Sequence, residues 1–169
     1  MPIHFKDLDI VSEIAGFRSA LIVPCQMCPA VTVAVREKKP FIQFFRNFLK
    51  SRPFEQHIKN LQSRLKKMDV DTNVFWSYLP HHWFLCMWSS SQCKKLKAHV
   101  QPYKAVIVLG CESAAETVRD IVDSNQCKVI EAMSVTGIMN ANIKFQFPCD
   151  IRFDNCKVIP ISQKEKTGS

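Results

Sequence analysis

Glycine is scarce in this chain, occurring only 4 times in 169 residues. The sequence contains no Gly-x-Gly-x-x-Gly, no Walker loop, no Gly-x-Ser-x-Gly and no His-Glu-x-x-His. A backbone approaches a pyrophosphate closely only where side chains are missing, so this composition disfavours a nucleotide-binding enzyme. The missing nucleophile and zinc-protease motifs disfavour those two classes of hydrolase.

Long apolar runs are missing as well. No stretch is long enough to cross a bilayer, so we expect no membrane partner. Residues 1–15 carry Lys6, Asp7, Asp9 and Glu13 where an export signal has its apolar core, so we expect a cytoplasmic protein. Apolar residues make up 47% of the chain and charged residues 22%, which is ordinary for a globular protein. We expect one domain over residues 1–162 and a disordered tail over 163–169.

Local patterns predict strands alternating with helices. Apolar runs predict strands at residues 19–24, 71–77, 84–86, 105–110 and 128–132, and alternation predicts two more at 144–147 and 157–161. Helices are expected from Pro29, from Pro40 with Phe41, Phe44, Phe45 and Phe48 on one side, after Pro53, from Ser89 to Val100, and from a capping box at Ser113. This order predicts an α/β fold. It has an open, mostly parallel sheet of the flavodoxin or Rossmann kind, helices on both faces and short C-terminal edge strands.

Cysteine, in contrast, is abundant, with 8 in the chain. In a chain without an export signal most of them should be reduced, and clustered reduced cysteines indicate metal binding or redox chemistry. Cys25, Cys28, Cys86 and Cys111 lie at or just after the ends of predicted strands. Because ligands gather at the carboxyl ends of parallel strands, we expect these four thiols to meet at one edge of the sheet.

Four thiolates suit Zn²⁺ or a [4Fe–4S] cluster and do not suit magnesium or calcium. The Cys25–Cys28 pair is also compatible with a reactive dithiol, and unliganded thiols are a further possibility. His81 and His82 are substitute ligands or simple surface histidines. Glu112 is a general base or a carboxylate at a helix entry. The remaining cysteines are interpreted as small hydrophobes or incidental thiols: Cys93, Cys127, Cys149 and Cys156.

The net charge of +8 is concentrated in one segment. Residues 36–67 contain ten Lys or Arg residues against Glu37 and Glu55, whereas the rest of the chain is balanced. A solvated helix face is the simpler interpretation, and a module that binds nucleic acid or an acidic protein is the alternative. No base-reading motif accompanies the charge, so nucleic acid is not the expected partner.

Two segments resemble a known family. Val-Pro-Cys-x-x-Cys at residues 23–28, and Tyr103 to Val118 with its Val-Ile-Val-Leu-Gly-Cys core, are similar to the C-terminal domain associated with methylene-tetrahydrofolate reductase. In acetogenic bacteria that domain is a separate small subunit that binds zinc or a cluster. The resemblance spans roughly residues 20–135. It implies a metal on the four cysteines and a flavoprotein partner of the methylene-tetrahydrofolate reductase kind.

This chain departs from the family pattern at two places. Pro29 and Ala30 stand where the family has Gly-Gly after the first cysteine pair, and Glu112 replaces the glycine after Cys111. These departures imply a smaller ligand set, or a metal that differs or is lost. The expected function is therefore an accessory or electron-transfer subunit in anaerobic one-carbon or related redox metabolism. The alternative is an enzyme that uses the Cys25–Cys28 dithiol or a metal-bound thiolate.

Overall fold

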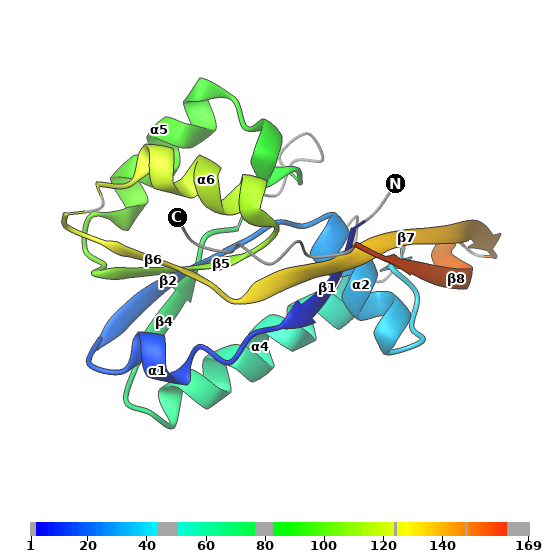
Figure 1. Cartoon of the computed structure of the whole chain (residues 1–169), viewed down its shortest axis with the longest axis horizontal. Coiled ribbons are helices and arrows are strands. Elements are labelled where there is room, and N and C mark those ends of the chain that lie inside the picture. The colour runs from blue at the N-terminus through cyan, green and yellow to red at the C-terminus, as the bar shows by residue number, and fades with distance from the viewer. Residues whose placement is uncertain (1–2, 44–50, 77–82, 124, 148, 162–169) are drawn as a thin grey trace.

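The computed structural model describes residues 3–43, 51–76, 83–123, 125–147 and 149–161. The described strands form two sheets (Figure 1). The parallel sheet has the order β4-β2-β5-β6, with β2 (Ser19–Pro24), β4 (Asp71–Val74), β5 (Ala105–Leu109) and β6 (Lys128–Glu131). The antiparallel sheet has the order β1-β7-β8-β3, with β1 (Ile3–Asp7), β3 (Ile42–Gln43), β7 (Met133–Gln146) and β8 (Asp150–Pro160).

Helices cover both faces of the parallel sheet, as expected. The described helical elements are α1 (Val11–Ile14), α2 (Cys28–Arg36), α4 (Arg52–Lys66), the 3₁₀ turn η2 (Leu85–Met87), α5 (Ser90–Val100) and α6 (Glu112–Ile121). Alternate residues of β2 and β5 enter two separate cores. Ile22 and Ile107 pack with α2, α4 and β1, whereas Leu21 and Val106 pack with α5 and α6. A strand that is buried on both faces must be apolar throughout, which is why these two strands were predictable from the sequence.

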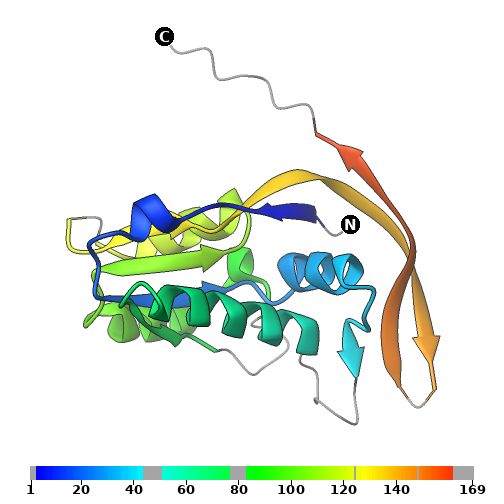
Figure 2. The ribbon, with the colours of Figure 1, turned by 90° about the horizontal axis from the view of Figure 1, so that it is seen from below.

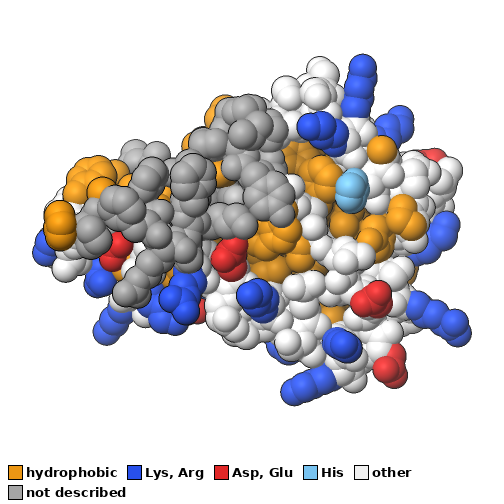
Figure 3. Space-filling view, turned by 180° about the vertical axis from the view of Figure 1, so that it is seen from behind, with side chains coloured by type: hydrophobic (Ala, Val, Ile, Leu, Met, Phe, Trp, Pro, Cys, Tyr) orange, Lys and Arg blue, Asp and Glu red, His pale blue; other side chains and the backbone are white. Residues whose placement is uncertain are grey.

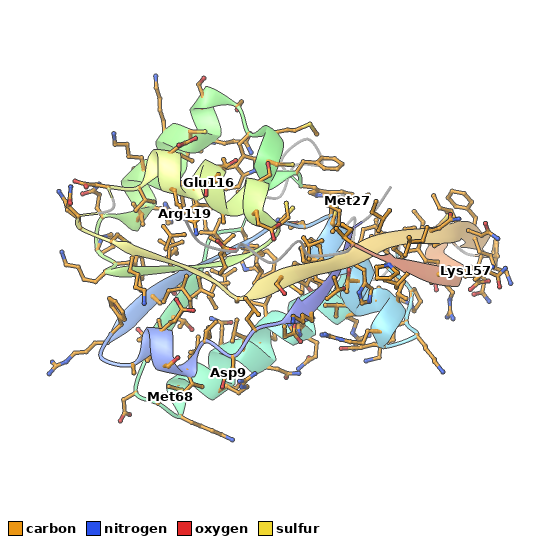
Figure 4. The ribbon with its side chains drawn as sticks, viewed as in Figure 1. Asp9, Met27, Met68, Glu116, Arg119 and Lys157 are labelled. Atoms are coloured by element: carbon orange, nitrogen blue, oxygen red, sulfur yellow. The ribbon has the colours of Figure 1, made fainter. Side chains whose placement is uncertain are left out.

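The chain passes from one sheet to the other at Ala132. The backbone N–H of Ala132 donates to Val108 of the parallel sheet, and its carbonyl accepts from Leu8 just after β1. The β7–β8 hairpin then curves around the end of α2 and projects away from the parallel sheet (Figure 2). On the face of the parallel sheet that α5 and α6 cover, Arg119 of α6 contacts the carboxylates of Glu116 on the same helix and Glu131 on β6 (Figure 4).

Several expectations are confirmed. The strand at 19–24 has the expected bounds, and the helices after Pro29, after Pro53 and up to Val100 are present. At α5, the side-chain oxygen of Gln92 accepts from the backbone N–H of Ser89 at 3.1 Å, which helps to fix the start of this helix. No helix in the described part of the chain is long and apolar enough to cross a membrane.

Other expectations are wrong. Residues 84–86 are not a strand, because Cys86 lies in η2. No helix begins at Pro40: Ile42 and Gln43 form β3, and Phe41 is buried within the monomer against Phe153, with ring centroids 5.6 Å apart. Phe44, Phe45 and Phe48 lie outside the described residues, as does the tail from residue 162.

The C-terminal strands and the start of α6 also differ from the prediction. β7 and β8 have 14 and 11 residues, and they form the interior of an antiparallel sheet instead of short edges on a parallel one. Only one of the two sheets is parallel, because β7 returns to pair with β1 at the start of the chain. Helix α6 begins at Glu112 with Cys111 as its N-cap, so Ser113 is already inside the helix and forms no capping box.

Candidate functional site

The topological switch point of the parallel sheet lies between β2 and β5. From β2 the chain crosses to β4 on one side, and from β5 it crosses to β6 on the other. Helix α2, which follows β2, packs in one core, and α6, which follows β5, packs in the other. Two neighbouring strands whose helices leave to opposite faces create an opening at their carboxyl ends, where open α/β sheets bind ligands.

Cys25 and Cys28 occupy the turn that leaves β2. The backbone N–H of Cys25 donates to the carbonyl of Leu109 at 2.8 Å, which extends the β2–β5 ladder by one bond. Cys25 is only 5% exposed, and its thiol donates to the carbonyl of Trp83 at 3.5 Å. Cys28 is the first residue of α2 and is half-buried. Pro29 fits behind it because the first turn of a helix requires few backbone donors.

Cys111 approaches the same opening from β5. It is the N-cap of α6, in extended conformation, and it follows the buried residue Gly110. A Cβ atom added to Gly110 would lie 2.7 Å from the Cβ of Ala114 and 3.5 Å from the Cβ of Cys25. Glycine is therefore required here to let the end of β2 and the start of α6 come this close.

Cys86 lies in a 3₁₀ turn and not, as the sequence pattern predicted, at the end of a strand. It is exposed on η2, which packs against α6. The segment before η2 is held by Trp83, whose carbonyl accepts from the backbone N–H of Gln26 at 3.0 Å and from the Cys25 thiol. These bonds to the Cys25–Cys28 turn bring Cys86 over the crevice without a strand of its own. A backbone carbonyl in this role leaves no pattern in the amino-acid sequence.

Two of the four thiols, Cys25 and Cys86, have a raised pKa, and burial is the main cause in both. Burial raises the pKa of the Cys25 thiol to about 12, backbone hydrogen bonds from Leu85 and Met27 oppose this only in part, and the nearby Cys28 and Cys86 raise it further. Burial also raises the pKa of Cys86, with additional contributions from Cys111 and Cys28. Cys86 thus lies within electrostatic range of Cys25, Cys28 and Cys111.

The four thiols are chemically suitable ligands for a thiophilic metal, but they are not arranged as a metal site in this structure. The four thiols come from three chain segments, and sulfur is the donor type that zinc and iron–sulfur clusters use. Among the described residues, no group of three or more His, Cys, Asp or Glu side chains is already arranged to hold a metal ion.

The other candidate residues lie elsewhere or outside the description. His81 and His82 fall in residues 77–82, which the structure does not describe. Glu112 is exposed on the first turn of α6, the position of a helix-entry carboxylate. The remaining cysteines are spread over α5, the segment before β6, and the β7–β8 hairpin: Cys93, Cys127, Cys149 and Cys156.

Comparisons with known proteins identified no relative of this chain. A scan against protein-family models found no match, and neither the search of curated proteins nor the search of solved structures did. The resemblance to the methylene-tetrahydrofolate reductase C-terminal domain therefore rests on the motifs at residues 23–28 and 103–118 alone.

Proposed function

We propose that this chain binds a zinc ion or a [4Fe–4S] cluster through Cys25, Cys28, Cys86 and Cys111. The observation that supports the proposal is that Cys25 and Cys111 follow the adjacent strands β2 and β5, while Trp83, just before η2, is hydrogen-bonded to the Cys25–Cys28 turn. The strand order β4-β2-β5-β6 is that of the first four strands of flavodoxin-like folds, whose ligand lies at the same switch point. A flavodoxin-like parallel half with a ligand at its switch point accounts for the placement of the cysteines.

The thiol of Cys25 lacks the properties of a free nucleophile. A reactive cysteine has a depressed pKa and is partly exposed, whereas the pKa of Cys25 is about 12 and its side chain is buried. These properties count against an enzyme that uses the Cys25–Cys28 dithiol. A bound zinc ion would link the turn after β2, η2 and the start of α6, and a cluster would supply one-electron transfer.

The role proposed for the site is that of a cytoplasmic accessory or electron-transfer subunit in one-carbon or related redox metabolism. The resemblance at residues 23–28 and 103–118 supports a flavoprotein partner of the methylene-tetrahydrofolate reductase kind. The exposed edge of the site supports contact with a partner as well, because Cys86 is exposed and Met87 beside it is 67% exposed. Thioether side chains are common at adaptable binding surfaces.

A basic interaction module has less support. Helix α4 carries its apolar residues inward and Lys59, Arg64 and Lys66 outward, as the solvated-face interpretation expects. On the face seen in Figure 3, the described Lys and Arg side chains are scattered, many at the border and some within the face, and they are not gathered into one stripe. A nucleic-acid groove requires such a gathering.

The test is metal analysis of the full chain purified without oxygen. We expect about one zinc ion, or about four iron atoms, per chain. Separate replacement of Cys25, Cys28, Cys86 and Cys111 by serine should lower the metal content at least tenfold, and should lower recovery of the partner with it. The matched variants Cys93→Ser and Cys149→Ser should retain both. Wild-type protein that holds no metal after anaerobic reconstitution would overturn the proposal.

A further inference from the structure

A cavity lies on the α4 face of the parallel sheet, among β1, the segment after β1, and α4. Its volume is about 190 Å³. The floor is apolar and is formed by the buried side chains of Ile10, Leu61, Leu109 and Ala132. The wall is polar and comes from Asp7 at the end of β1 and from His57, Asn60 and Arg64 on α4. A cavity with an apolar floor and a few convergent polar groups is the usual form of a small-molecule site.

Two of the polar wall groups, Asp7 and His57, already have partners, which are each other and Arg36. The Asp7 carboxylate accepts from the Arg36 guanidinium at 2.8 Å and lies 3.5 Å from Nε2 of His57. Nδ1 of His57 lies 3.4 Å from Nη2 of Arg36. The guanidinium can only donate, so Nδ1 accepts and the proton of His57 is on Nε2, facing Asp7. His57 is thus neutral, and the charge of Asp7 is balanced by Arg36.

Arg64 and Asn60 are the groups left to recognise a ligand. They are four residues apart on α4 and therefore lie on the same side of the helix. Arg64 is exposed and forms no ion pair within the described part of the chain. The carbonyl of Asn60 accepts from the side chain of Gln56 at 3.0 Å, which leaves its amide N–H groups to donate. The wall therefore has one unbalanced positive charge beside an amide donor.

We propose that this cavity binds a short-chain carboxylic acid in its anionic form. The carboxylate would pair with the guanidinium of Arg64, which matches it with two parallel donors, and would accept from Asn60. The hydrocarbon chain would cover Leu61, Leu109 and Ala132. The volume equals roughly six water molecules, so an acid of about four to six carbons fits and a nucleotide does not. Asp7, held by Arg36 and His57, would reject a ligand with a second negative charge at the inner end.

The experiment is a titration of the full chain with sodium pentanoate, followed in ¹H–¹⁵N correlation spectra. We expect saturable shifts in β1 and α4, with a dissociation constant in the millimolar range or below. Acetate should bind at least fivefold more weakly because it cannot reach the apolar floor, and pentylamine should cause no shifts at these positions. Arg64→Gln should weaken pentanoate binding at least tenfold. The matched variant Arg18→Gln, at another exposed arginine, should leave it unchanged.

Two outcomes would overturn the proposal. One is the absence of saturable shifts in β1 and α4 with pentanoate. The other is equal binding of pentanoate by wild type and Arg64→Gln, which would show that the guanidinium takes no part. Arg64 is exposed, so loss of the folded state is not expected to obscure the comparison. The thiols take no part in this binding, so the result is independent of the metal proposal.

Discussion

The thiol of Cys25 donates a hydrogen bond to the backbone carbonyl of Trp83, 3.5 Å away. This contact joins the end of β2 to Trp83, 58 residues further along the chain and just before the turn that carries Cys86. The same carbonyl accepts from the backbone of Gln26, so the segment just before η2 is bonded to the Cys25–Cys28 turn at two points. The arrangement of the four thiols thus depends on the fold as a whole and not on one local loop.

Cysteine reactivity should differ sharply within the site. In the reduced, metal-free protein, we expect iodoacetamide at pH 8 to modify the exposed Cys149 readily and Cys25 least of all eight cysteines. The pKa of Cys25 is about 12 and its side chain is 5% exposed, so almost no accessible thiolate is present. Peptide mass spectrometry measures the rates. Equal labelling of Cys25 and Cys149 would contradict the buried placement of Cys25.

Metal should protect the site from the same reagent. With zinc added, labelling of Cys28, Cys86 and Cys111 should slow at least tenfold, because a bound thiolate is not free to react. Cys149 and Cys93 serve as internal controls and should react at unchanged rates. Protection of all cysteines alike would indicate that zinc acts on the protein in general and not at this site.

Gly110→Ala should disturb both the fold and the site. The added Cβ would lie 2.7 Å from the Cβ of Ala114, closer than packed side chains approach. We expect a loss of about 1–3 kcal/mol in the free energy of unfolding, as for other overpacked positions, together with weaker metal binding. Gly16→Ala is the control: Gly16 has a φ of 91° with no atom within 4 Å of the added Cβ, so only backbone strain is expected there. Denaturant unfolding of the two variants separates these effects.

Phe41 provides a test of the corrected fold. It is 4% exposed and meets Phe153 edge to face, so Phe41→Ala should cost about 3–5 kcal/mol of unfolding free energy. Phe147→Ala, at a side chain that is 96% exposed, should change it by less than about 0.5 kcal/mol. If Phe41→Ala proved as neutral as Phe147→Ala, Phe41 would belong to an exposed helix and the antiparallel sheet would be wrongly placed.

The pH dependence of stability should carry a contribution from His57. Burial lowers the pKa of His57, opposed by Asp7 and assisted by Arg36, so the folded chain takes up its proton at lower pH than the unfolded chain does. Stability should therefore fall as the pH is lowered from about 6.5, the unfolded value, through the folded pKa. His57→Gln should show a shallower fall over this window. A slope identical to that of wild type would contradict the neutral His57 between Asp7 and Arg36.

The sequence predicted those parts of the structure whose residues are buried by local neighbours. Residues 20–24 and 105–109 are apolar at every position because both faces of β2 and β5 are covered. The antiparallel sheet was not predicted, because its pairing partners are distant along the chain. β1 pairs with β7 and β3 pairs with β8, more than 100 residues away. Residues 84–86 resemble a buried strand in composition, but only Leu85 is buried, and a 3₁₀ turn satisfies that requirement.

The candidate site was predictable for a different reason. Cys25 and Cys111 follow adjacent parallel strands, so their meeting follows from the topology. Cys86 was expected at the end of a strand, but it lies in the 3₁₀ turn η2, next to Trp83 and its hydrogen bonds to the Cys25–Cys28 turn. The cavity beside His57 left no sequence signal, because its parts come from β1, α4 and the end of β5, which are distant along the chain.

The most direct test of the central claim is X-ray absorption at the metal edge of the full chain, purified and reconstituted without oxygen. The proposed site predicts a first shell made of sulfur, at about 2.3 Å for zinc, with four sulfur scatterers. In Cys86→Ser one sulfur should be replaced by a lighter atom, whereas Cys93→Ser should match wild type. A first shell dominated by nitrogen or oxygen, or a protein that takes up neither zinc nor iron, would contradict the claim that these four cysteines form a metal site.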